Sequence, residues 1–233
     1  MSRIERIGDA TLYLGDAYDI RPTLGWFDAD ILDPPYLLMT SGGGCFRKDR
    51  PYLDQIREEG FADGFDHRII NPLLCGAVVS FCSNDQLPKL ATYLDGSFHR
   101  FAVCAWRKLT PMPVANKHYV PEIELYLHAW NRGYHPRGGL SDLKRIVDCR
   151  SRQSKDFDHP TVKPEAVMDK ILCNAAGASV CDPFMGTGST GVAAIRAGKR
   201  FTGIEHNPKH FDTACRRIED AVRLTGAFEG EAA

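Results

Sequence analysis

No stretch of this sequence is long and apolar enough to cross a membrane, and its N-terminus lacks the apolar core of a signal peptide. No segment repeats along the chain, so a repeat architecture is not expected. A length of 233 residues suits one large domain, or one domain with an inserted lobe. We therefore expect a soluble, cytoplasmic protein with a substantial core.

The cysteines lack the Cys-x-x-Cys pairs that zinc sites and redox-active thiols use, although there are eight of them. Several stand within apolar runs, as small core residues do, among them Cys75, Cys82, Cys104 and Cys181. We expect reduced thiols, with neither a disulfide framework nor a metal site.

The chain also lacks an excess of either charge. Its 29 Lys and Arg residues balance 30 Asp and Glu residues, which gives a formal net charge of −1. Such a balance gives no overall affinity for nucleic acid, so any basic surface must be local.

The most informative stretch is Asp182-Pro183-Phe184-Met185-Gly186-Thr187-Gly188-Ser189-Thr190. It follows a short apolar run and leads into an expected helix, and a Gly-x-Gly turn at that point lets the backbone approach a ligand. About twenty residues later an expected strand ends at Glu205, where a nucleoside-binding αβ unit places the carboxylate that holds ribose hydroxyls. An ordinary strand-to-helix turn gives the same glycine pattern, but Glu205 in register favours a binding site.

Another carboxylate follows an expected strand near the N-terminus. Asp16, in Gly15-Asp16-Ala17, comes directly after residues 10–14. It lies at the edge where α/β sheets bind ligands, or it caps the helix that follows; both can hold at once.

The next strand runs into Asp33-Pro34-Pro35-Tyr36. Two prolines force a rigid turn, which fixes the Asp33 carboxylate, the Pro34 carbonyl and the Tyr36 ring in one small volume. Two acceptors suit an amino group with two hydrogens, and the ring beside them suits a planar base.

Residues 37–64 contain Ser41-Gly42-Gly43-Gly44 followed by Arg47 and Lys48. A glycine hinge beside basic residues predicts a mobile lid next to the site. A plain surface loop is an equal interpretation.

Residues 131–155 are locally basic, with Lys and Arg outnumbering Asp142 and Asp148 and with Tyr134 and His135 interleaved. This composition fits contacts to phosphates and bases, although a charged surface insert would look similar. In the two loop segments together, the candidate nucleic-acid contacts are Arg47, Lys48, Arg132, Arg137, Lys144, Arg145, Arg150 and Arg152.

Strand patterns alternate with helical ones, which predicts an α/β fold with a mostly parallel sheet covered on both faces. The expected strands include residues 10–14, 27–32, 77–82, 98–108 and 122–130, and the expected helices are residues 66–74, 84–94, 165–175 and 208–224. The two strands at 98–108 and 122–130 have no clear helix between them, which predicts an antiparallel hairpin at one edge. Residues 226–233 are expected to be a frayed tail.

Taken in order, these motifs resemble the β-class DNA amino-methyltransferases, which use S-adenosylmethionine. The resemblance spans most of the chain and is carried by Gly15-Asp16-Ala17, Asp33-Pro34-Pro35-Tyr36, His159-Pro160-Thr161-Val162-Lys163-Pro164, the stretch from Asp182 to Thr190, and Gly203-Ile204-Glu205. It implies a Rossmann-like, doubly wound fold in circularly permuted order. Residues 1–130 would be the catalytic half, 131–158 a small target-recognition insert, and 159–225 the cofactor-binding half.

The resemblance also implies a role for each motif residue. Asp33, Pro34, Pro35 and Tyr36 would be catalytic. Cofactor binding would fall to Asp16, Ala17, Thr161, Lys163, Asp182, Phe184, Gly186, Gly188, Ser189 and Glu205. In that set Asp16 would contact the adenine, Glu205 the ribose and Asp182 the amino group, with Thr161 and Lys163 bordering the methionine end.

The implied activity is site-specific methylation of adenine N6 in double-stranded DNA, by direct in-line displacement on a flipped-out base. The family's Ser-Pro-Pro variants contrast with the Asp33 motif, which favours adenine. Cytosine N4 is the alternative, because the two amines present nearly the same geometry. RNA or protein methylation is disfavoured, because those relatives tend to carry Asn in place of Asp33.

Two other classes remain as alternatives, a non-catalytic nucleic-acid-binding module and a nicotinamide-dependent Rossmann enzyme. Intact Asp33, Tyr36 and Glu205 argue against the first. The second leaves the Asp33 motif and the basic segment unexplained, although Gly191 completes its glycine pattern. As partners, the resemblance suggests a second copy of the chain and a cognate restriction endonuclease.

Overall fold

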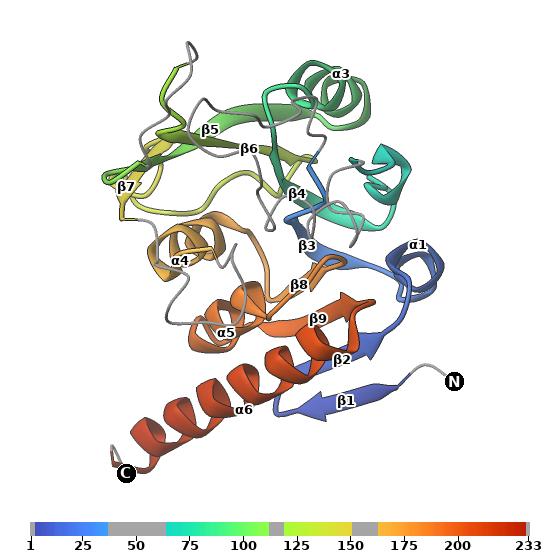
Figure 1. The fold of residues 1–233 in the computed structure, drawn as a ribbon, viewed down its shortest axis with the longest axis vertical. Coiled ribbons are helices and arrows are strands. Elements are labelled where there is room, and N and C mark those ends of the chain that lie inside the picture. The colour runs from blue at the N-terminus through green and yellow to red at the C-terminus, as the bar shows by residue number, and fades with distance from the viewer. Residues whose placement is uncertain (1–2, 37–63, 112–118, 151–162, 232–233) are drawn as a thin grey trace, which may run out of the picture.

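The computed structural model describes residues 3–36, 64–111, 119–150 and 163–231. They form one sheet of nine strands with helices on both of its faces (Figure 1). The strands are β1 (Ile4–Ile7), β2 (Ala10–Leu14), β3 (Phe27–Leu32), β4 (Cys75–Cys82), β5 (Arg100–Lys108), β6 (Ile123–Trp130), β7 (Ile146–Cys149), β8 (Ser179–Asp182) and β9 (Arg200–Glu205). The helices are α1 (Ala17–Ile20), α3 (Leu87–Ser97), α4 (Glu165–Asn174), α5 (Ser189–Arg196) and α6 (Pro208–Glu231), with 3-10 turns at Arg21–Thr23 and His67–Ile69.

The strands lie in the order β1-β2-β9-β8-β3-β4-β6-β5-β7. The central strands from β2 to β4 run parallel to one another, whereas β1 and β6 run antiparallel to their neighbours. This confirms the predicted α/β fold with a mostly parallel sheet. Every residue of β4 is buried, as expected for a strand covered on both faces.

The predicted antiparallel hairpin is β5 and β6. It does not form the edge of the sheet, because β7 pairs with β5 on the outer side. β7 lies within residues 131–158, which are predicted to be the target-recognition insert. Its four residues, Ile-Val-Asp-Cys, are too few to show a strand period among so many charges.

The helices divide between the two faces. α4, α5 and α6 pack their apolar sides into one core, which includes Ile31 and Phe81 of the sheet. α1 and α3 pack against the other face, around Val78 and Leu127. This is the doubly wound arrangement that the alternation of strands and helices predicts.

The expected helix at residues 66–74 is wrong, because only the 3-10 turn His67–Ile69 forms there. Pro72 cannot donate the hydrogen bond that a continuing helix needs. The Asn71 side chain instead accepts a hydrogen bond from the Leu73 N–H at 2.9 Å, which turns the chain toward β4. At the other end of the chain α6 continues to Glu231, beyond the predicted end near residue 224.

The parallel strands end at a common edge of the sheet, the carboxyl edge. β9, the last strand of the chain, lies between β2 and β8, and Leu14 of β2 is opposite Glu205 of β9. The two halves of the permuted chain therefore share one continuous sheet. Residues that follow strands in either half converge at the same edge.

No helix in the described ranges is long and apolar enough to span a bilayer. The described cysteines are free thiols, and Cys75, Cys82 and Cys181 are buried, as expected for core residues.

A buried ion pair fixes β3 to the turn that precedes it. Arg21 donates to the Asp30 carboxylate through Nε at 2.9 Å and through Nη2 at 3.0 Å, and both side chains are 1% exposed. Two further guanidinium hydrogens reach the carbonyl oxygens of Gly25 at 3.0 Å and Leu74 at 2.9 Å. One side chain thus joins the turn before β3, β3 itself and the turn before β4.

We predict that Arg21→Met lowers the free energy of unfolding by about 3–5 kcal/mol, because it leaves Asp30 as an unpaired buried charge. The double variant Arg21→Met/Asp30→Leu should recover much of this loss, since an apolar pair replaces the ion pair. Urea unfolding followed by circular dichroism measures both. As a control, Arg107→Ala removes the exposed pair with Asp148 and should cost about 1 kcal/mol or less. Equal losses for Arg21→Met and Arg107→Ala would contradict the prediction.

Candidate active site

Four carboxylates follow four parallel strands at the carboxyl edge. Asp16 follows β2, Asp33 follows β3, Asp182 ends β8 and Glu205 ends β9. These strands are neighbours in the sheet, so the side chains meet although they are far apart in sequence. A ligand at this edge would therefore meet several carboxyl groups at the place where α/β sheets bind ligands.

The glycine turn between β8 and α5 is held by Asp182. Its carboxylate accepts the Phe184 N–H at 2.9 Å through Oδ1 and the Thr190 hydroxyl at 2.6 Å through Oδ2. Gly186 and Gly188 have φ angles of 53° and 83°, which favour glycine, and α5 begins directly after them. A Cβ atom built on Gly186 would meet no atom within 4 Å, so open space lies beside the turn.

Glu205 joins this turn to the end of β9. Its carboxylate accepts the Gly186 N–H at 2.9 Å and the Asn207 N–H at 2.7 Å. Its carbonyl oxygen accepts the Gly15 N–H at 2.9 Å, which brings the β2 end alongside. The side chain of Asp16 then caps α1 by accepting the Tyr18 N–H at 2.7 Å, so the capping interpretation of Asp16 holds.

Burial raises the pKa of Asp182 to about 7, against the effect of its hydrogen bonds from Thr190 and Phe184. The nearby carboxylates of Asp33 and Glu205 add to the rise. Near neutral pH this group therefore exchanges a proton readily, and a cation placed beside it would favour the ionised form.

Lys163 lies against Asp33. Its Nζ is 2.7 Å from both carboxylate oxygens of Asp33 and 2.8 Å from Oε1 of Glu124, which comes from β6. The Lys163 side chain is 9% exposed and that of Glu124 14%. Two carboxylates from the first half of the chain thus share one buried ammonium from the second half.

Tyr36 completes this buried cluster. Its hydroxyl donates to Glu124 Oε1 at 2.9 Å and lies 3.3 Å from Asp33 Oδ1. Lys163 Nζ lies 5.4 Å from the centre of the Tyr36 ring and 4.7 Å from that of Phe81, within cation–π range. The ring of Tyr36 is therefore held by its hydroxyl, next to the Asp33 carboxylate.

The charges in this cluster depend on one another. Burial raises the pKa of Asp33, and Lys163 opposes that rise. Burial alone would also raise the pKa of Glu124, but the ammonium groups of Lys163 and Lys108 lower it to about 2. Burial would lower the pKa of Lys163, and the two carboxylates raise it instead. Lys163 is therefore the cation that favours the ionised form of both acids.

Three residues of the site have no signal in the sequence. Gln86 donates to the Pro35 carbonyl at 3.0 Å and so braces the proline turn. Arg217 of α6 donates to the Thr187 carbonyl at 2.6 Å and holds the glycine turn from behind. Glu124 stands in an ordinary strand pattern, and only the pairing of β6 with β4 brings it near Asp33.

The basic residues of segment 131–155 are divided between the two edges of the sheet. Arg132 and Arg137 follow the end of β6, which runs antiparallel and ends at the amino edge of the parallel strands. Arg150 follows β7, which runs parallel to β5 and ends beside Lys108, at the carboxyl edge. Lys144 and Arg145 precede β7. Of the other predicted site residues, Arg47, Lys48, Arg152 and Thr161 lie outside the described ranges, as does the predicted lid apart from Gly64.

A family model described as DNA methylase, covering N6 and N4 enzymes, matches residues 28–216, which include the Asp33 motif, the glycine turn and Glu205. The chain belongs to this DNA methylase family. It is thus an S-adenosylmethionine-dependent DNA methyltransferase with a Rossmann-like fold, and the nicotinamide interpretation is set aside.

Curated relatives agree with this family assignment. The type II methyltransferase M2.DpnII of Streptococcus pneumoniae is 41% identical, over 82% of this chain and 82% of its own length. The type II methyltransferase M2.LlaDCHI of Lactococcus lactis subsp. cremoris is 25% identical, over 82% of this chain and 81% of its own. The methyltransferase is therefore similar to members of type II restriction-modification systems.

Solved structures show the same fold. M1.HpyAVI, crystallised in complex with SAM, has a TM-score of 0.66 and 28% identity, covering 89% of this chain and 99% of its own. The cytosine-N4-specific PvuII DNA methyltransferase has a TM-score of 0.64 over 93% of this chain and 92% of its own. At 13% identity the PvuII enzyme shows the fold alone.

We predict that Lys163→Met destabilises the methyltransferase by several kcal/mol, and by more at pH 7 than at pH 5. In the wild type the lowered pKa of Glu124 contributes stability above about pH 4.5, which is lost as the pH falls toward 2. Without Lys163, burial raises the pKa values of both carboxyl groups, so their ionisation opposes folding as the pH rises.

Urea unfolding at both pH values measures this difference, with Lys89→Met at an exposed position as the matched control. A destabilisation that is the same at the two pH values would show that Lys163 does not govern the ionisation of these acids.

Proposed function

We propose that this methyltransferase transfers a methyl group to N6 of adenine in DNA, on a base turned out of the duplex. The observation that carries the proposal is the Asp33 carboxylate, whose ionised form Lys163 favours and which is fixed beside the Tyr36 ring at the carboxyl edge. Cytosine N4 is the second candidate, because the family includes both kinds of enzyme and PvuII, which shares the fold, is cytosine-N4-specific.

The donors and acceptors at the carboxyl edge fit S-adenosylmethionine. This cofactor carries a ribose diol, an ammonium group and a sulfonium, all of which suit carboxylate neighbours. Glu205 would take the diol, because each of its oxygens accepts one backbone N–H and keeps a further lone pair. Asp182 would bind the ammonium group, which would lower the raised pKa of this carboxyl group. Asp16 would contact the adenine amino group.

The glycine turn would hold the methionine end of the cofactor. Open space lies beside Gly186, and Gly186, Gly188 and Ser189 would bind the methionine end there at the N-terminus of α5, where free N–H groups suit a carboxylate. Phe184 packs edge-on against Tyr18, at 6.1 Å between ring centres, and would form an apolar side. Thr161 and Ala17 stay predictions, and Lys163 would reach the methionine end from its place at Asp33.

When bound, the cofactor supplies a methyl group on a positively charged sulfur. The chain's own residues prepare the amine that receives this group. The amine lone pair is delocalised into the ring, so the amine is a poor nucleophile. Asp33 and the Pro34 carbonyl would accept its two N–H bonds and favour a pyramidal nitrogen with the lone pair free.

Positive charge develops on the amine nitrogen as its new bond to carbon forms, and the proton that it then loses leaves toward the acceptors around it. The ionised Asp33 stabilises that charge electrostatically. The Lys163 ammonium donates a hydrogen bond to each Asp33 oxygen. A carboxylate oxygen can accept more than one donor, so Asp33 can also accept an N–H of the amine. Glu124 acts as a positioning residue, since it shares Lys163 and orients Tyr36.

Turning a base out of the duplex costs a few kcal/mol, and stacking on an aromatic ring returns about 1–3 kcal/mol. Tyr36 would provide that ring. The DNA backbone would follow the carboxyl edge, where Arg150 follows β7. Lys144, Arg145, Arg152, Arg47 and Lys48 stay predicted DNA contacts. The target sequence, a second copy of the chain and a restriction endonuclease partner stay predictions of the resemblance.

Methylation of plasmid DNA followed by nucleoside mass analysis tests the proposed base. We expect N6-methyladenine from the wild type and a loss of about 100-fold or more for Asp33→Ala, since one electrostatic contact in a transition state is worth that much. Asp85→Ala, at an exposed carboxylate, is the control and should keep the activity. N4-methylcytosine would overturn the adenine assignment, and an unchanged rate for Asp33→Ala would overturn the role of Asp33.

Calorimetry tests the role of Asp182. At about pH 6 its carboxyl group is mostly protonated, because its pKa is raised to about 7. An ammonium group placed beside it lowers that pKa, so cofactor binding should release close to one proton at about pH 6 and almost none at about pH 8. Titrations in two buffers of different ionisation enthalpy count the protons. Asp182→Asn should abolish the release; release that persists in this variant would contradict the assignment.

A further inference from the structure

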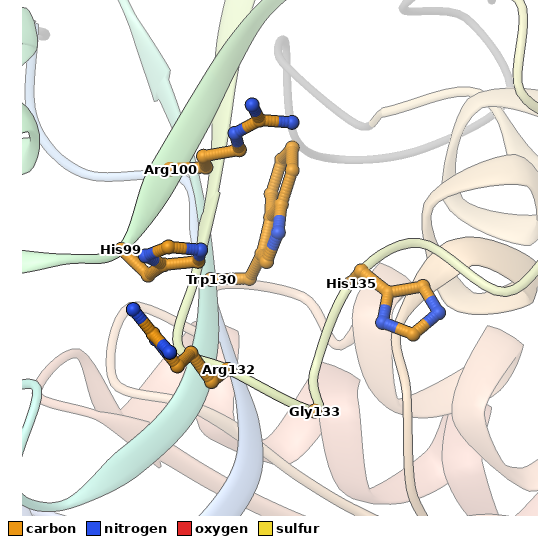
Figure 2. A pocket seen from close by; sticks show the side chains of 6 residues that line it. All are labelled: His99, Arg100, Trp130, Arg132, Gly133 and His135. Atoms are coloured by element: carbon orange, nitrogen blue, oxygen red, sulfur yellow. The ribbon is translucent and has the colours of Figure 1, made fainter.

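A second pocket opens at the amino edge of the sheet, away from the active site. It has a volume of about 280 Å³ and is lined by His99, Arg100, Trp130, Arg132, Gly133 and His135 (Figure 2). We call these six residues the distal pocket. Its lining combines two guanidinium groups, two imidazoles and an indole, without an acidic side chain.

The fold places the basic and aromatic groups together. Arg100 and Trp130 are directly opposite each other in the antiparallel pair of β5 and β6, so their side chains share one face of the sheet. The ring of His128 lies edge-on to Trp130 at 5.4 Å between centres and supports the indole from within the same strand.

The segment that carries the other lining residues is held rigidly. The Asn131 side chain donates to the carbonyl oxygens of Pro72 at 3.1 Å and Cys75 at 3.2 Å. The Tyr134 ring lies over Gly76 so closely that a Cβ there would be 2.2 Å from it. Gly133, with a φ of 89°, makes the turn between them. Arg132 and His135 therefore come from a fixed backbone.

Both guanidinium groups of the distal pocket are free to bind a ligand. Several other exposed arginines pair with carboxylates, as Arg107 does with Asp148 and Arg196 with Glu165. In the described part of the chain, the side chains of Arg100 and Arg132 have neither an ion pair nor a hydrogen bond. Such unpaired arginines suit phosphate, which they bind through paired hydrogen bonds.

The distal pocket is distinct from the active site in position. Glu124, in the Lys163 cluster, and Trp130 stand six positions apart on β6, which corresponds to about 20 Å along a strand. That span equals about six phosphate steps along one strand of a B-form duplex.

We propose that the distal pocket binds one unpaired nucleotide of a nucleic-acid strand, outside the target base. The base would stack on the Trp130 indole, and its phosphates would lie between Arg100 and Arg132. The volume is close to the lower end of the range for small-molecule pockets, which suits a single nucleotide. Stacking needs an open base face, so the bound nucleotide is unpaired.

Fluorescence anisotropy of a labelled single-stranded oligonucleotide tests the proposal on the full chain. Arg100→Ala/Arg132→Ala should weaken binding by about tenfold or more, and should flatten the slope of log K against log salt by about 1.4, since two phosphate contacts are lost. Trp130→Leu should also weaken binding, by about fivefold or more, whereas Trp130→Phe keeps a stacking ring and should retain most of the affinity.

A matched control separates the distal pocket from general charge. Arg216→Ala/Arg223→Ala removes the same charge from the exposed side of α6, and should change affinity less than about threefold. Two results would overturn the proposal. One is an equal loss of affinity for the two arginine pairs. The other is an equal loss of affinity for Trp130→Leu and Trp130→Phe, measured in proteins that unfold at the same urea concentration.

The identity of the ligand supplies the remaining arms of the test. If a free 5′-mononucleotide binds the wild type but the pocket variants do not change the affinity for the oligonucleotide, a nucleic-acid strand is not the ligand. If an acidic peptide displaces the labelled oligonucleotide and unlabelled nucleic acid does not, the pocket does not recognise a nucleotide. These readouts use no cofactor and no methyl transfer, so they are independent of whether adenine is the target.

Discussion

The ion cluster of Lys163, Asp33 and Glu124 constrains this molecule more than any other contact. The side chains of Lys163 and Glu124 are 9% and 14% exposed and that of Asp33 is 30% exposed, so partial removal from water disfavours each charge and the opposite charges offset that cost. Lys163 belongs to the second half of the chain, and both carboxylates belong to the first. The site therefore exists in its charged form only when the two halves are joined, and the aromatic ring of Tyr36 is held by the same cluster.

The sequence predicts those parts of the site that arise from local patterns. Asp182 and Glu205 each end a strand, and the glycines and prolines beside the acids are visible without any tertiary information. Glu124 could not be predicted, because its approach to Asp33 depends on β6 pairing with β4 across a long separation. The contact of Lys163 with Asp33 was also missed, since a motif shows that a residue matters without showing which atom it meets. In the fold, β7 was missed because four residues carry too little pattern among charges.

The strand directions separate two kinds of surface. At the carboxyl edge, acids and a glycine turn offer groups that suit the proposed cofactor and target amine. At the amino edge, where β6 ends and β5 begins, arginines without carboxylate partners surround Trp130. The antiparallel course of β6 links the two, because it carries Glu124 at one end and Trp130 at the other. A nucleic acid that contacts both edges would be positioned by the sheet itself rather than by a separate domain.

The place of β9 has a consequence for synthesis of the protein on the ribosome. β2 pairs with β1 and β9, so the first hairpin to emerge has no further strand to join until nearly the whole chain has been translated. The glycine turn also waits for Arg217, on the last helix, to bind the Thr187 carbonyl. A nascent or truncated chain thus cannot assemble the cofactor side of the site. A premature stop codon before Arg217 would therefore yield a chain that lacks the contact holding the glycine turn.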